Sequence, residues 1–167
     1  MKQARQPIAT GGCQCGAIRY ALFRRPPKAG LCSCRMCQKA VGGPFLAWAN
    51  IPAADFAWTR GVPGTFQSSS AAERYFCPNC GTPLGFKYLK RPGVLSVTIG
   101  SLDAPHDVAI AEILGIEGRW PTLEPDRLAA LPAYRTGQVS PPEDLSRIRV
   151  FQHPDHATSD SWNSNAG

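Results

Sequence analysis

The sequence has no long uninterrupted run of apolar residues, which argues against a membrane-spanning helix. Its longest apolar stretches, residues 45–51 and 108–116, are far shorter than the ~20 residues that such a helix needs. The basic amino terminus continues into Ile-Ala-Thr-Gly-Gly-Cys instead of the apolar core of a signal peptide. We therefore expect a cytoplasmic protein whose cysteines stay reduced.

Dense runs of basic residues are also absent, although the formal net charge is +6. The tightest basic groups, within residues 24–28 and 87–91, are sparse beside the runs typical of nucleic-acid-binding tails. The sequence therefore argues against a nucleic-acid partner and favours a solvated basic surface. An anionic small molecule fits the same charge, and nothing indicates an oligomeric state.

The composition is that of a folded protein with few helices. Hydrophobic residues make up 43% and charged residues 18%, which is ordinary for a globular domain. Sixteen glycines and sixteen prolines disfavour long helices and predict many turns. We expect one domain over residues 1–137, followed by a polar tail or surface-wrapping arm over residues 138–167.

Short segments of apolar and β-branched residues predict a mainly β fold, arranged as a sandwich or barrel-like structure. In the first strand, alternation places Tyr20 and its apolar neighbours on one face and Arg19 on the solvent face. Residues 35–41 predict about two turns of helix, ended by Gly42. The expected strands cover residues 17–22, 30–34, 45–51, 65–69, 73–76, 84–89, 94–99 and 108–116.

All seven cysteines fall in three clusters, which predicts metal ligands in a reducing compartment. Structural zinc takes four tetrahedral ligands, whereas catalytic zinc keeps three protein ligands and one open position. The local triplet can fold around one ion, which leaves the two outer pairs to close a four-thiolate structural site. The clusters are Cys13-x-Cys15, Cys32-x-Cys34-x-x-Cys37 and Cys77-x-x-Cys80.

Other arrangements remain open from the residues alone. All seven thiols can serve folding, with the triplet completed by His106 or some cysteines simply buried, and thiolates also bind iron–sulfur clusters. His153 and His156 stand in the polar tail, where we expect solvated side chains and no metal ligation.

Residues close to the triplet have two interpretations each. Arg35 and Lys39 either offset the negative charge of three thiolates and hold a substrate carboxylate, or simply face solvent. Phe45 and Trp48 either wall a pocket or pack in the core, and core packing is the interpretation we favour.

Several segments of the chain resemble the glutathione-dependent formaldehyde-activating enzyme family, called GFA, which includes the centromere protein V type. The resemblance covers roughly residues 10–135, with the three cysteine clusters in the same order and spacing. The segments that carry it are residues 11–20, 32–39, 43–48, 74–84 and 97–105.

The resemblance implies an antiparallel β-tent of short strands with two zinc ions per chain. Cys13, Cys15, Cys77 and Cys80 match the structural ligands, and Cys32, Cys34 and Cys37 match the catalytic ones. The implied activity is formation of S-hydroxymethylglutathione from glutathione and formaldehyde, a carbon–sulfur lyase reaction run in the adduct direction. This chain has no histidine beside its first two clusters, and residues 111–120 match the family's late strand only loosely.

The leading functional hypothesis is therefore a zinc-dependent carbon–sulfur lyase-like enzyme acting on a small thiol adduct. Zinc at the open triplet would either stabilise the substrate thiolate or act as a Lewis acid on an aldehyde oxygen. The alternatives are a zinc-stabilised module that binds nucleic acid or protein, and a non-catalytic glutathione carrier or sensor.

Overall fold

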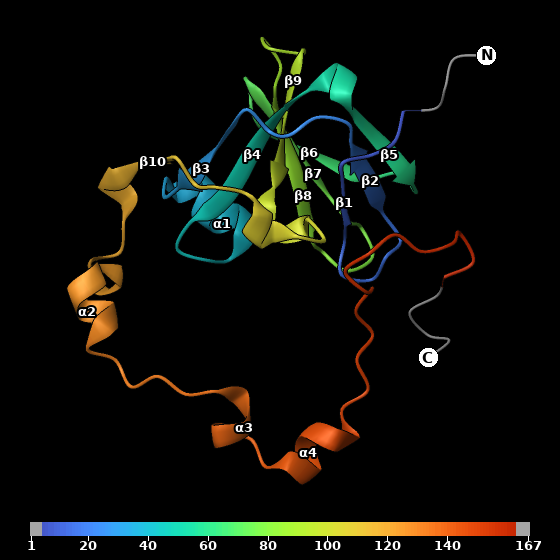
Figure 1. The fold of residues 1–167 in the computed structure, drawn as a ribbon. Coiled ribbons are helices and arrows are strands. Elements are labelled where there is room, and N and C mark those ends of the chain that lie inside the picture. Colours follow the sequence, from blue (N-terminus) through green and yellow to red (C-terminus); the bar gives the residue numbers. More distant parts are fainter. Residues whose placement is uncertain (1–4, 163–167) are drawn as a thin grey trace.

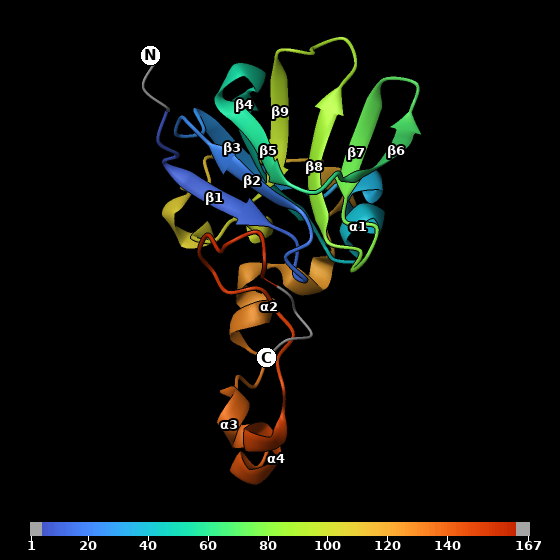
Figure 2. The same ribbon diagram turned by 90° about the vertical axis from the view of Figure 1, so that its right-hand side faces the viewer.

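Two β-sheets form the centre of the computed structural model, which describes residues 5–162. The first four residues and the last five of the expected tail lie outside the described part. One sheet has the strand order β1-β2-β5 and the other β10-β3-β4-β9-β8-β7-β6 (Figures 1 and 2), which confirms the mainly β class. The strands are β1 Ala9–Gly12, β2 Arg19–Leu22, β3 Lys28–Cys32, β4 Leu46–Pro52, β5 Phe56–Arg60, β6 Gly64–Ser69, β7 Ala72–Phe76, β8 Pro83–Tyr88, β9 Val94–Thr98 and β10 Glu112–Leu114.

Helices are short throughout the described residues, as the glycine and proline content predicts. The helix expected over residues 35–41 forms with those bounds as α1, and none of the described helices is long and apolar enough to cross a membrane. The α-helices are α1 Arg35–Val41, α2 Pro125–Ala129, α3 Thr136–Val139 and α4 Pro142–Arg147. The 3-10 helices are η1 Ala53–Asp55, η2 Ile99–Ser101, η3 Pro105–Asp107, η4 Ile116–Gly118 and η5 Pro121–Leu123.

The structure differs from the sequence-based strand prediction at strands β1, β5 and β10. Strands β1 and β5 were not expected, and both owe their extended form to pairing with β2. The strand expected over residues 108–116 shrinks to β10, which pairs parallel with β3 while the other described pairs are antiparallel. A strand of three residues is too short for an alternation of apolar and polar side chains to be recognised in the sequence.

The core lies between the two sheets. Tyr20, on β2, is fully buried and packs its ring against Phe56 and Trp58 of β5. The Tyr20 hydroxyl lies 2.8 Å from the Ser101 hydroxyl, so the polar end of this core residue has a hydrogen-bond partner. The Trp58 ring also packs against Tyr75 of β7 at 5.9 Å between centroids, which joins the small sheet to the large one.

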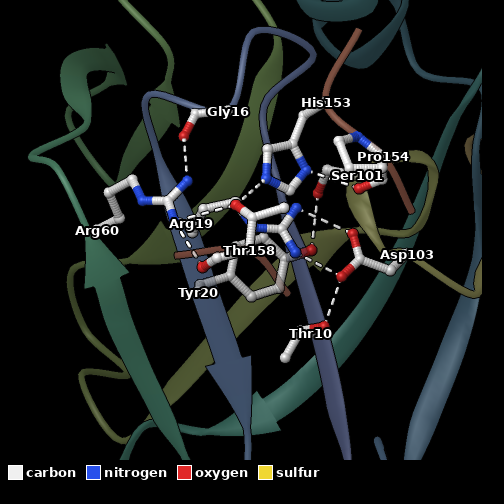
Figure 3. Close-up of polar contacts among 10 residues, drawn as sticks. All are labelled: Thr10, Gly16, Arg19, Tyr20, Arg60, Ser101, Asp103, His153, Pro154 and Thr158. Carbon is white, nitrogen blue, oxygen red and sulfur yellow. Dashed lines mark hydrogen bonds and ion pairs between the residues drawn. The ribbon is translucent and has the colours of Figure 1, made fainter. Parts of the chain in front are cut away.

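The prediction that Arg19 faces solvent is wrong, since its residue is only 5% exposed. Its guanidinium forms a two-pronged ion pair with Asp103, with Nη1 donating to Oδ1 at 2.9 Å and Nη2 to Oδ2. The Thr10 hydroxyl donates to the same carboxylate (Figure 3). A buried charge of this kind is tolerated because the carboxylate, 84 residues away along the chain, neutralises it.

The carboxyl-terminal part of the chain leaves the sheets and then returns to them (Figures 1 and 2). The returning segment, residues 150–162, is called the arm below. Its His153 N–H donates to the Gln14 carbonyl at 2.7 Å, and the His153 ring packs against Trp162 at 4.5 Å between centroids. The residue boundary expected between 137 and 138 falls inside α3.

His153 therefore departs from the expectation of a solvated histidine, being only 3% exposed, whereas His156 is exposed. Its Nε2 lies 2.8 Å from the Thr158 hydroxyl, and burial lowers the pKa of the imidazole. Arg60 of β5 bridges the turn and the same segment, donating to the carbonyl oxygens of Gly16 and Thr158 (Figure 3). It also donates to the Ser159 carbonyl. The arm is thus held against the turn that joins β1 to β2.

Replacing Asp103 by Asn should leave the Arg19 charge buried without its counter-charge. We expect the free energy of unfolding in urea to fall by about 3 kcal/mol. The matched control is Asp107→Asn, because that side chain is 70% exposed and surface changes cost about 0.5 kcal/mol or less. Equal losses for the two variants would contradict the stabilising role of the buried pair.

Gly16→Ala should displace the arm, because an added Cβ would lie 2.4 Å from His153 Cδ2 and 2.5 Å from the Trp162 ring. Gly81→Ala is the control, since Gly81 has a similar left-handed φ of 77° but no atom within 4 Å of its added Cβ. Both variants share the backbone strain, about 1–2 kcal/mol. Hydrogen exchange of the His153 amide should accelerate in Gly16→Ala only, and equal rates would contradict the contact.

Candidate metal centres

Four cysteines from two distant turns meet at one edge of the molecule. Cys13 and Cys15 lie in the turn between β1 and β2, and Cys77 and Cys80 lie in the turn between β7 and β8. Their four Sγ atoms all lie within 4.8 Å of one another. The structure therefore brings together the two outer pairs that the sequence analysis grouped into one site.

Each turn supplies hydrogen-bond donors to its sulfurs. The Ile18 N–H donates to Cys13 Sγ and the Asn79 side chain to Cys15 Sγ, each at 3.2 Å, and the Thr82 hydroxyl lies 3.2 Å from Cys80 Sγ. N–H and O–H groups directed at sulfur favour the thiolate form. The groups around this cluster thus stabilise negatively charged sulfurs.

The thiols nevertheless differ in their preferred protonation. Burial raises the pKa of Cys13 to about 12. Burial acts in the same direction on Cys80, but the Thr82 side chain and backbone outweigh it and lower that pKa to about 6. Because negative sulfurs packed this closely repel one another, the full four-thiolate state requires a cation at the centre.

The sulfur positions fit such a cation. All seven cysteines are free thiols, and the Sγ atoms of Cys13 and Cys15 are 3.6 Å apart, while those of Cys15 and Cys77 are 3.8 Å apart. A tetrahedral ion with metal–sulfur bonds of about 2.3 Å has sulfur–sulfur edges of about 3.8 Å. These two edges match that geometry, so the donor set could hold a thiophilic metal ion.

The remaining cysteines form a second cluster with three donors. Cys32 ends β3, Cys34 directly precedes α1 and Cys37 lies in its first turn. Their Sγ atoms lie within 4.8 Å of one another, and all three residues are partly exposed. His106, the alternative fourth ligand, is exposed and joins neither cluster of the described residues.

The start of α1 creates unequal thiols in this triplet too. Burial raises the pKa of Cys32 to about 12. Burial also opposes ionisation of Cys34, but the backbone N–H groups of Cys37 and Met36 outweigh it, so its pKa lies below the ordinary value. The first N–H groups of a helix have no partner within the helix, and a sulfur at this place can accept from them.

A later segment of the chain fixes the backbone of the triplet. The buried Gln38 amide donates to Ser33 O at 2.9 Å and to Gly118 O at 2.6 Å, which ties α1 to η4. An added Cβ at Gly115 would lie 2.6 Å from Cys34 N, and one at Gly118 would lie 2.4 Å from Ser33 O, so this segment packs directly on the backbone of the triplet. The turn over residues 115–118 therefore positions the triplet.

Arg74 of β7, which the sequence analysis missed, contacts the triplet through its guanidinium. Its Nη2 lies 3.6 Å from Cys37 Sγ. The two candidates considered from the sequence are both exposed, and Arg35 donates to Gln38 Oε1 at 3.3 Å. Neighbouring sequence positions revealed only the basic residues of α1, whereas Arg74 reaches the site through sheet pairing.

The two aromatic residues next to the triplet have different surroundings. Trp48 is buried, and its Nε1–H has no hydrogen-bond partner among the described residues, while Phe45 is largely exposed. The expectation of core packing thus describes Trp48 but not Phe45.

Comparison with known proteins decides the family. The model described as "Glutathione-dependent formaldehyde-activating enzyme", GFA, matches residues 8–113, which hold all seven cysteines. The chain belongs to the GFA family. The GFA match ends before the turn over residues 115–118 and before the arm, so both lie beyond the matched domain.

Two individual proteins resemble the chain in part. An uncharacterized lyase of Schizosaccharomyces pombe is 38% identical over 82 residues, which are 49% of this chain and 59% of that protein. The chain thus spans well under two thirds of the length of that relative. A crystal structure of a Rhodobacter sphaeroides protein has a TM-score of 0.51 and 23% identity, covering 62% of this chain and 98% of that chain, which shows similarity of the fold.

The two clusters should respond differently to loss of one ligand. We expect two metal ions per chain by elemental analysis, falling to one in Cys37→Ser with the fold retained. Cys77→Ser should unfold the protein, because structural metal binding is coupled to folding by about 10–16 kcal/mol at neutral pH. Circular dichroism reports the fold, and unfolding of Cys37→Ser would contradict the division into a structural and an open site.

Proposed function

We propose that the chain is a zinc-dependent carbon–sulfur lyase-like enzyme that forms or cleaves the adduct of a small thiol with an aldehyde, with S-hydroxymethylglutathione as the leading candidate. The observation that carries the proposal is the partly exposed triplet of Cys32, Cys34 and Cys37, which offers three donors where the other cluster offers four. Membership of the GFA family supports the thiol and the aldehyde. The proposed cofactor content is one structural and one open-site zinc.

The proposed reaction is balanced without any further reactant. In the adduct direction the thiol sulfur bonds to the aldehyde carbon, and the thiol proton ends on the former carbonyl oxygen. The lyase direction breaks the same bond and returns the proton to sulfur. A zinc ion held by the triplet would stabilise the substrate thiolate or polarise the aldehyde oxygen.

The chain's own residues contribute position and charge. Gln38 and the turn over residues 115–118 hold the backbone around the triplet, so the three donors stay aligned for a ligand. The three cysteines are partly exposed, so water can reach the triplet, and we assign the substrate proton to solvent. Seven free thiols also suit a reducing compartment such as the cytoplasm.

Two-dimensional exchange NMR of glutathione, formaldehyde and their adduct tests the reaction directly. The zinc-loaded protein should speed interconversion, and Cys37→Ser should reduce the enzymatic rate by about 100-fold or more, since even second-shell changes at metal sites cost 10–100-fold. Arg25→Gln, which alters an exposed residue of the β2–β3 loop, should leave the rate unchanged.

The same spectra distinguish the carrier or sensor alternative from an enzyme. Glutathione signals that shift on addition of protein, with an unchanged interconversion rate, would contradict catalysis and favour binding alone. No shift and no acceleration would exclude the family reaction for this chain.

A further inference from the structure

The outer face of the large sheet carries an ordered row of side chains beside the triplet. The pairing register places Asn50, Ser96, Phe86 and Arg74 opposite one another on β4, β9, β8 and β7. Paired residues project to the same side of a sheet. The Ser96 hydroxyl donates to Asn50 Oδ1 at 2.6 Å, and the Arg74 guanidinium lies 5.0 Å from the Phe86 ring centre.

This row faces away from the core. Ala49 and Val97, the neighbours along β4 and β9, are buried at 0% and 1% exposure and point between the sheets. Residues of the row itself are only partly buried, because successive side chains of a strand alternate between the two faces. A ligand bound at the triplet can therefore extend over this outer face.

Arg74 contacts the triplet, but most N–H donors of its guanidinium have no partner among the described residues. Among the described residues, its side chain makes one hydrogen bond, to Cys37 Sγ at 3.6 Å, and no ion pair. Glu73 lies next to it in sequence but projects to the other face, where it accepts from Tyr75. A guanidinium has five N–H donors, so most of those on Arg74 remain for a ligand.

The ligand that suits this arrangement is a carboxylate. A guanidinium binds a carboxylate through two parallel hydrogen bonds, and stacking on an aromatic ring, here Phe86, restricts the orientation of its plane. Arg35 and Lys39 carry the same charge on α1, but both are exposed and neither has a hydrogen bond to a sulfur of the triplet. Arg74 is the cation that strand pairing fixes in place.

We propose that Arg74 is a specificity-determining residue that binds a carboxylate of the substrate, so that the triplet selects acidic thiols over neutral ones. The inference rests on the proposed function only in taking a thiol as the ligand of the triplet. It deepens that function by naming the chemical class of the thiol. Neutralising the thiolates alone would be a different role, because it would affect every thiol equally.

Calorimetric titration of the zinc-loaded protein with glutathione and with 2-mercaptoethanol separates these roles. Arg74→Gln should weaken glutathione binding by about 10- to 100-fold, the usual effect of losing a charge-assisted pair, and change 2-mercaptoethanol binding less than about twofold. Arg74→Lys keeps the positive charge but lacks the planar guanidinium that makes two parallel hydrogen bonds. It should therefore recover only part of the lost glutathione affinity. Arg25→Gln controls for the lower net charge.

Zinc content and thermal melting of each variant show whether the site is intact. If Arg74→Gln fails to fold, the ratio of the two affinities in Arg74→Lys supplies the same comparison. Equal weakening of both thiols, no weakening of either, or a wild-type protein that binds neither thiol would overturn the inference. Selective glutathione binding without faster adduct formation would instead refute the proposed reaction and leave the role of Arg74 standing.

Discussion

The meeting of two cysteine turns is the contact on which the rest of the structure depends. The turn of Cys13 and Cys15 belongs to the small sheet, and the turn of Cys77 and Cys80 belongs to the large one. Their sulfurs are close enough to share one ion, yet burial raises the pKa of Cys13 to about 12. A cation bound by these four sulfurs would therefore couple ionisation of the thiols to the packing of the two sheets against each other.

The surroundings of the first turn show how firmly this position is specified. Strand β2 leaves the turn with Arg19, whose buried charge is neutralised by Asp103 from the segment after η2. The arm contacts the same turn through the His153 amide, which donates to the Gln14 carbonyl. Arg60 of β5 bridges the two by donating to Gly16 in the turn and to Thr158 in the arm. Contacts from three distant segments therefore converge on the turn that carries Cys13 and Cys15.

The features that the sequence predicted correctly depend on local spacing. Helix α1 was expected from the seven residues that precede the helix-ending Gly42, and the grouping of the cysteines into a set of four and a set of three was expected from their spacing. Buried Arg19 and His153 could not be predicted in this way, because their partners lie 84 and 139 residues away: Arg19 pairs with Asp103 and the His153 amide with Gln14. Sequence patterning reports burial of apolar side chains, whereas burial of a charge depends on a partner that only the fold brings near.

Strand β7 runs between the two cysteine clusters and contacts both. Arg74 faces the triplet from the middle of this strand, and Cys77 follows its last residue into the four-thiol cluster. The pairing of β7 with β8 shifts register between Tyr75 and Phe76, so the side chains before and after this irregularity need not share one alternation. Holding Cys77 at the four-thiol cluster therefore fixes the end of β7 and restricts where Arg74 can lie. The contacts of the Arg74 guanidinium with Cys37 Sγ and the Phe86 ring restrict its side chain further. In the proposed function, the four-thiol cluster would thus help to place Arg74 beside the three-thiol cluster.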